Sequence, residues 1–139
     1  MPGWGTGSFE NEHAQSFLAR LNSLEIGDLR PILARAADQE DYLEAPESSM
    51  AIAAAEVVAV LVVSARGVAV EDGVRPAGPR ELVNWASKDE SGAPPDLVYL
   101  ARRAVERVRT NSELKDLWLE AEGLNEWSAA LRELEGRLR

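Results

Sequence analysis

Residues 50–63 read MAIAAAEVVAVLVV and form the most apolar segment of the chain. It is apolar on nearly every side of a helix, and Glu56 is its only ionisable residue. A helix with that pattern has no polar face for solvent, so other elements must surround it. Its length and its alanine-rich first half favour a helix, while the β-branched residues 57–63 leave a strand as the alternative there. We therefore predict a central helix over about residues 47–66.

Amphipathic segments lie on both sides of this stretch. Apolar residues recur at helical spacing before it and after it, most regularly from Asp96 onwards. Side chains that favour helix N-termini precede four of these segments. The expected caps are Asn11, Asp28, Ser112 and Asn125. A further short helix carrying Trp85 is expected to begin at Pro79, with loops over residues 67–79 and 91–95.

This pattern predicts an all-α fold. Six or seven short helices, with no sustained alternation of apolar and polar residues, are typical of a single compact bundle around the central helix. An irregular lead-in containing glycine and tryptophan precedes the bundle. A chain of 139 residues is enough for one apolar core, so we expect a single helical domain over residues 1–139.

The amino-acid composition argues against several classes of function. The chain has 15 Lys and Arg against 24 Asp and Glu, a formal net charge of −9. Nucleic acid binding needs clustered positive charge, so this balance argues against a nucleic acid partner. With no cysteine and one histidine, His13, the chain has no disulfide, thiolate metal site or histidine-rich metal centre. We predict no cofactor and no metal.

The sequence also predicts a soluble, cytoplasmic protein. The N-terminus lacks the basic and apolar regions of a secretory signal. The apolar stretch is shorter than the roughly 20 residues that span a bilayer, and it contains Glu56. We therefore expect no membrane association.

Glu56 is the most informative single residue. A carboxylate in an apolar helix costs several kcal/mol to bury unless it is paired, hydrogen-bonded or protonated. Arg107, which flanks the apolar stripe of the helix after Asp96, is the candidate partner for a buried ion pair. The alternative is that Glu56 acts as a general base or metal ligand in a cleft.

Two further groups of residues could serve a fold or a site. The acidic residues between 38 and 47 are interpreted as a solvated loop, with a divalent-cation site as the alternative. They are Asp38, Glu40, Asp41, Glu44 and Glu47. The sequence has four tryptophans, Trp4, Trp85, Trp118 and Trp127. Trp118 and Trp127, which lie at helical spacing, are interpreted as core residues rather than a ligand cage. Several tryptophans together on the surface would instead mark an interface or oligomer contact.

The opening of the chain resembles a known family. Residues 3–14 read GWGTGSFENEHA, similar to the Gly-x-Trp-Gly-x-Gly-x-Phe-x-Asn-Asp/Glu-x-Ala signature of small bacterial proteins catalogued as domain of unknown function 4259. Later segments, including 42–47, 54–58 and 112–118, are also similar. The resemblance implies a stand-alone bacterial helical domain with no assigned activity and no catalytic residues to transfer. Its signature positions, compatible with fold maintenance or a site, are Trp4, Phe9, Asn11, Glu44, Glu47, Glu56 and Trp118.

Two function classes remain. The leading hypothesis is a non-enzymatic interaction module of accessory, regulatory or immunity type, which meets a basic protein partner through an acidic helical face. The alternative is a small enzyme or a metal- or ligand-binding protein, which requires Glu44, Glu47 and Glu56 to converge within about 4–6 Å of one another. The sequence leaves the oligomeric state open.

Overall fold

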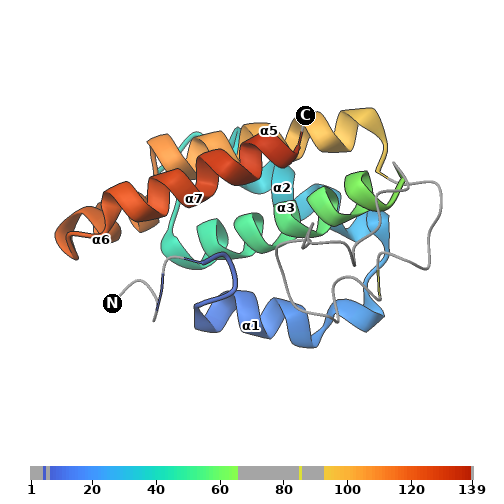
Figure 1. The fold of residues 1–139 in the computed structure, drawn as a ribbon, viewed down its shortest axis with the longest axis horizontal. Helices are drawn as coiled ribbons and strands as arrows, with labels where there is room; N and C mark the ends of the chain where they lie inside the picture. The colour runs from blue at the N-terminus through green and yellow to red at the C-terminus, as the bar shows by residue number, and fades with distance from the viewer. Residues whose placement is uncertain (1–4, 6, 66–84, 86–92, 139) are drawn as a thin grey trace.

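The computed structural model describes residues 5, 7–65, 85 and 93–138. These residues form α-helices and one short 3₁₀ helix with no strand among them, which confirms the all-α fold (Figure 1). In chain order the elements are α1 (Glu12–Ala19), η1 (Leu21–Ser23), α2 (Ile26–Asp38), α3 (Ala45–Ala65), α5 (Pro95–Thr110), α6 (Glu113–Glu120) and α7 (Leu124–Arg137). The loop expected at 67–79 and most of the short helix expected after Pro79 lie outside the described residues.

The central helix is confirmed as α3. Every side chain from Ala51 to Val62 is buried, including Glu56. This burial results from packing on several sides, because α3 contacts α1, α2, α5, α6 and α7 (Figure 1). The strand alternative for residues 57–63 is wrong, since the helix runs through them without interruption.

The apolar character of α3 also makes it resemble a membrane span. Its Ala45–Val62 window has a mean hydropathy of 1.5, enough by length and composition to cross a bilayer. However, 78% of that window is buried by the rest of the protein. Such burial is what the core helix of a bundle shows.

Two of the predicted helix caps are confirmed. The Asn11 side chain accepts a hydrogen bond from the Ala14 N–H at 2.8 Å and begins α1. The Ser112 hydroxyl accepts one from the Lys115 N–H at 3.1 Å and begins α6. In each case an extended residue with a short oxygen-bearing side chain satisfies an otherwise unpaired helical N–H.

The other two predicted caps are wrong. Helix α2 begins after Glu25, and Asp28 lies inside the first turn, where it accepts the Glu25 N–H at 2.8 Å in a reciprocal capping box. Helix α7 begins after Gly123, so Asn125 is already helical. The predicted starts of these two helices are wrong by two or three residues. In both cases the chain is already helical before it reaches the residue that we expected to cap the helix.

The turn between α6 and α7 explains the position of Gly123. The N–H groups of Glu122 and Gly123 donate to the carbonyls of Leu119 at 3.2 Å and Trp118 at 3.0 Å, which closes α6 as a Schellman motif. Glu122 takes the left-handed conformation, with φ 61°, at the position that usually carries glycine. A Cβ on Gly123 would lie 2.7 Å from Cε3 of Trp118, so the absence of a side chain there lets the indole fold under the turn.

Candidate functional site

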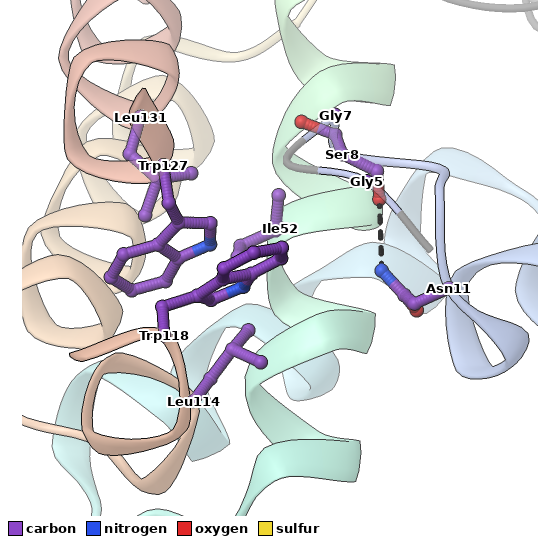
Figure 2. Close-up of a pocket in the computed structure, with 9 residues that line it drawn as sticks. All are labelled: Gly5, Gly7, Ser8, Asn11, Ile52, Leu114, Trp118, Trp127 and Leu131. Carbon is purple, nitrogen blue, oxygen red and sulfur yellow. Dashed lines mark hydrogen bonds between the residues drawn. The ribbon is translucent and has the colours of Figure 1, made fainter. Parts of the chain in front are cut away.

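A small cavity lies between the N-terminal segment and two tryptophans. The segment supplies Gly5, Gly7, Ser8 and Asn11, and Figure 2 shows the adjacent indoles of Trp118 and Trp127 on the other side. Ile52, Leu114 and Leu131 complete the lining. Its volume is about 10 Å³, which accommodates at most one water molecule. We call this space the tryptophan cavity.

Side-chain contacts hold the N-terminal segment over the core. Phe9 is 9% exposed and belongs to the hydrophobic core, and its carbonyl accepts a hydrogen bond from Gln15 Nε2 at 2.8 Å. The Asn11 amide donates to the Ser8 carbonyl at 3.5 Å (Figure 2). The Gly7 N–H donates to Oε1 of Glu10 at 3.1 Å, so the Glu10 side chain folds back over the glycines. Trp4 lies outside the described residues.

The partner of Glu56 is Arg137, so the predicted pairing with Arg107 is wrong. Glu56 is 3% exposed, and its Oε1 lies 2.7 Å from Nη1 of Arg137 in the last turn of α7. Ser8 of the N-terminal segment lies close enough to the Glu56 carboxylate for its side chain to lower the pKa of that group. These contacts connect the N-terminal segment, α3 and α7 at one buried carboxylate.

Arg107 instead satisfies backbone carbonyls. Its guanidinium donates to the carbonyls of Asn111 at 3.0 Å, Asp41 at 2.9 Å and Gln39. These bonds tie the end of α5 to the chain that leaves α2. Helical periodicity placed Arg107 beside an apolar stripe correctly, but it could not tell which neighbouring helix that edge faces.

Burial raises the pKa of Glu56 above its usual range. The positive charge and hydrogen bond of Arg137 and the side chain of Ser8 lower it only in part, and the nearby Glu133 raises it further. Oε1 receives no aligned hydrogen bond despite its closeness to Arg137, whose guanidinium also binds Glu133 at 2.8 Å. The Glu56 carboxylate is sealed from solvent and does not line the tryptophan cavity. The geometry supports a role in holding three elements together.

The structure does not bring Glu44, Glu47 and Glu56 together. Glu47 and Glu56 lie on the same helix, separated by about 14 Å of axial rise. Glu47 pairs with Arg35 at 3.2 Å, and Glu44 is exposed before the first turn. Across residues 7–65 and 93–138 no group of three or more histidine or acidic side chains could hold a metal ion.

Contacts with α5 and α6 hold the two ends of the acidic segment that follows α2. Asp38 pairs with Arg103 of α5 at 2.7 Å. Leu43 is fully buried, and its carbonyl accepts the Glu113 N–H at 2.8 Å. The Glu113 carboxylate in turn accepts the Ala45 N–H at 2.8 Å. The start of α3 is thereby locked to the start of α6.

These contacts bring the partly exposed Glu113 and the exposed Asp116 and Glu120 to the same side as Tyr42. Tyr42 is 52% exposed, and its hydroxyl donates to Oδ2 of Asp116 on α6. That hydrogen bond, followed by desolvation and the charges of Asp116, Glu113 and Glu120, raises the pKa of Tyr42 to about 12. None of the three carboxylates forms an ion pair with another described residue. We call Tyr42, Glu113, Asp116 and Glu120 the acidic face.

The three described tryptophans are buried, as we predicted for Trp118 and Trp127. Trp85, Trp118 and Trp127 are 9%, 7% and 3% exposed. The Trp85 indole N–H donates to the Leu24 carbonyl at 3.0 Å, which satisfies its one polar group. An interface built on exposed tryptophans therefore has no support at these positions.

A family model described as "Domain of unknown function (DUF4259)" matches residues 3–130. The chain belongs to the DUF4259 family. This match confirms the family that the opening signature indicated. No curated protein and no solved structure matches the chain. DUF4259 membership therefore supplies no activity, and the chemistry must come from the geometry.

Several signature residues of this DUF4259 chain meet at the tryptophan cavity. Asn11 and Trp118 line it, while Phe9 and Glu56 anchor the segment that covers it. Glu44 and Glu47 lie elsewhere, at the start of α3. Sequence reasoning missed Arg137 and Asp116. The available signal for Arg137 was its place between the inward Leu134 and Leu138, whereas Asp116 carried none.

Proposed function

We propose that this DUF4259 chain is a non-enzymatic protein-interaction module of accessory, regulatory or immunity type, which binds a basic partner through the acidic face. The bacterial cytoplasm is the proposed setting. The observation that carries the proposal is the exposed Tyr42 beside three carboxylates that engage no Lys or Arg among the described residues.

Electrostatics supports a basic partner. The carboxylates of Glu113, Asp116 and Glu120 repel one another, and a partner that brings positive charge relieves this repulsion. The net charge of −9 adds a long-range field that accelerates the approach of a basic protein. Specific association through such a face should weaken as salt screens it.

The acidic face is also preorganised for contact. The buried Leu43 and the two Glu113 hydrogen bonds fix the backbone on either side of Tyr42. The Tyr42 hydroxyl is held by Asp116, so the ring position is set before a partner arrives. Tyrosine is enriched at interfaces because it offers a large contact area at a small entropic cost.

The test compares two variants that change the net charge equally. In Asp116→Asn/Glu120→Gln the acidic face loses two charges, while Glu113 is kept because it caps α3. The control is Glu12→Gln/Glu126→Gln, which removes two exposed carboxylates from the first turns of α1 and α7. Each protein is tagged in its own host, purified under mild conditions and quantified by mass spectrometry.

We expect one basic companion protein with the wild type and the control, reduced about tenfold with the acidic-face variant, a change equivalent to about 1.4 kcal/mol. Equal recovery of the companion by all three proteins would show that the acidic face is not the binding surface. Recovery of no stoichiometric companion by the wild type would refute the interaction module itself.

A further inference from the structure

A second feature, independent of the acidic face, is a groove between α5 and α7. It has a volume of about 300 Å³ and is lined by Tyr99, Arg102, Arg103, Glu106 and Glu135. The four α5 residues follow i, i+3, i+4 and i+7 spacing, so they share one side of that helix. A groove of this size is at the lower end of the range for small-molecule sites.

Two of the four charged lining groups are already neutralised within the protein. Both carboxylate oxygens of Glu135 are bound by Arg109, at 2.7 and 3.2 Å. The Arg103 guanidinium is bound to Asp38 at 2.7 Å. By contrast, Arg102 and Glu106 make no ion pair with any residue that the structure describes. The groove therefore offers one positive and one negative group, a helical turn apart.

Tyr99 gives this charge pair an aromatic wall. It is 55% exposed, and its ring centroid lies 5.7 Å from the Arg102 guanidinium carbon and 5.8 Å from that of Arg103. Both distances fall within the range of cation–π attraction, which orders the two arginine side chains before a ligand binds. An ordered guanidinium loses less entropy when it grips a carboxylate.

We propose that this groove binds a free α-amino acid with an apolar side chain. Arg102 binds the carboxylate and Glu106 binds the ammonium group, while the side chain packs on the exposed part of Tyr99. The two charged groups of an α-amino acid lie close together, and hydrogen bonds of about 3 Å on each side extend their reach to residues one turn apart. The carboxylate of Glu106 and the net charge of −9 disfavour a multiply charged anion such as phosphate.

Binding is measured on the full chain by ¹⁵N-detected NMR titration with four probes. They are phenylalanine, N-acetylphenylalanine, phenylalaninamide and inorganic phosphate. We expect saturable shifts around Tyr99 and Arg102 with phenylalanine, with a dissociation constant in the millimolar range appropriate to so small a ligand. Each analogue lacks one charged group and should bind about tenfold more weakly, as expected for the loss of one charge-assisted hydrogen bond.

Substitutions test whether Arg102 binds the carboxylate of the ligand and Glu106 binds its ammonium group. Arg102→Gln should weaken phenylalanine binding about tenfold, and Glu106→Gln should make phenylalanine and N-acetylphenylalanine bind equally. Arg132→Gln, which removes an exposed arginine on α7 outside the groove lining, is the control and should bind phenylalanine as the wild type does. The spectra report folding in the same experiment. The proposal is overturned by the absence of saturable shifts in the wild type, by phosphate binding as tightly as phenylalanine, or by unchanged binding in Arg102→Gln.

Discussion

Replacing Glu56 by glutamine tests whether burial controls the charge of this residue. Glutamine keeps the shape of the side chain and an oxygen that can accept from Ser8, but it removes the negative charge next to Arg137. Removing one member of a buried ion pair usually costs about 3–5 kcal/mol, because the other charge is stranded. Arg137 is not stranded here, since Glu133 still binds it at 2.8 Å and it is 20% exposed.

At pH 8 we therefore expect no net cost of Glu56→Gln, because the relief of carboxylate desolvation at least offsets the lost ion pair, as the raised pKa of Glu56 indicates. The pH dependence is the sharper result. A carboxyl group whose folded pKa is raised contributes stability that is full below its unfolded pKa and is lost as the pH rises through the folded pKa. Between those values the wild type should gain about 1.4 kcal/mol relative to Glu56→Gln for each unit by which the pH falls.

The assay is urea unfolding of both proteins from pH 8 to pH 5, followed by circular dichroism, with the free energy of unfolding compared at each pH. Glu126→Gln serves as the control, because it removes an exposed carboxylate from α7 and leaves Glu56, Arg137 and Glu133 in place. A wild-type advantage that shrinks as the pH falls would mean that Arg137 and Ser8 outweigh burial, and the reasoning about Glu56 would be refuted.

Three other predictions concern single contacts. Glu122→Gly should raise the free energy of unfolding by about 1 kcal/mol, because glycine adopts φ 61° without steric cost; a neutral or negative change in a urea titration would contradict this. In a Tyr99→Phe background, ultraviolet absorbance should show that the Tyr42 hydroxyl titrates near pH 12, and Asp116→Asn should return its pKa towards about 10. A pKa near 10 with Asp116 in place would show that the hydrogen bond is absent in solution. Arg107→Gln should destabilise the protein by about 1–3 kcal/mol by leaving carbonyls unpaired, and an unchanged thermal melt would show that water replaces the guanidinium.

The parts of the fold that the sequence predicted were those set by local patterns. The central helix followed from a stretch without a polar face, and the Asn11 and Ser112 caps followed from side chains that bond within one turn. The predicted start of α7 is wrong because the observed start depends on how Trp118 packs against Gly123, in the space that a side chain at this position would occupy. Such packing cannot be predicted from local residue preferences. The single-domain organisation stays a prediction.

The candidate sites were harder to predict, because they join residues far apart in the chain. Periodicity shows that an arginine lies at the edge of an apolar stripe, but the choice between Arg107 and Arg137 depends on which helix packs against Glu56. The acidic segment was noticed as a run of charge, yet the contact of Tyr42 with Asp116 required α6 to lie beside it. Long-range packing of this kind has no signature in a single sequence.

The difference in burial gives Glu56 and the carboxylates of the acidic face different roles. Glu56 is sealed between elements, so a change there must alter the stability of the protein before it alters any binding. Asp116 and Glu120 are exposed on α6, where surface substitutions usually change stability by no more than about 0.5 kcal/mol. A loss of partner binding in acidic-face variants with an unchanged free energy of unfolding would therefore identify a recognition surface. The same loss caused by Glu56→Gln would reflect only the loosening of the N-terminal segment from α3 and α7.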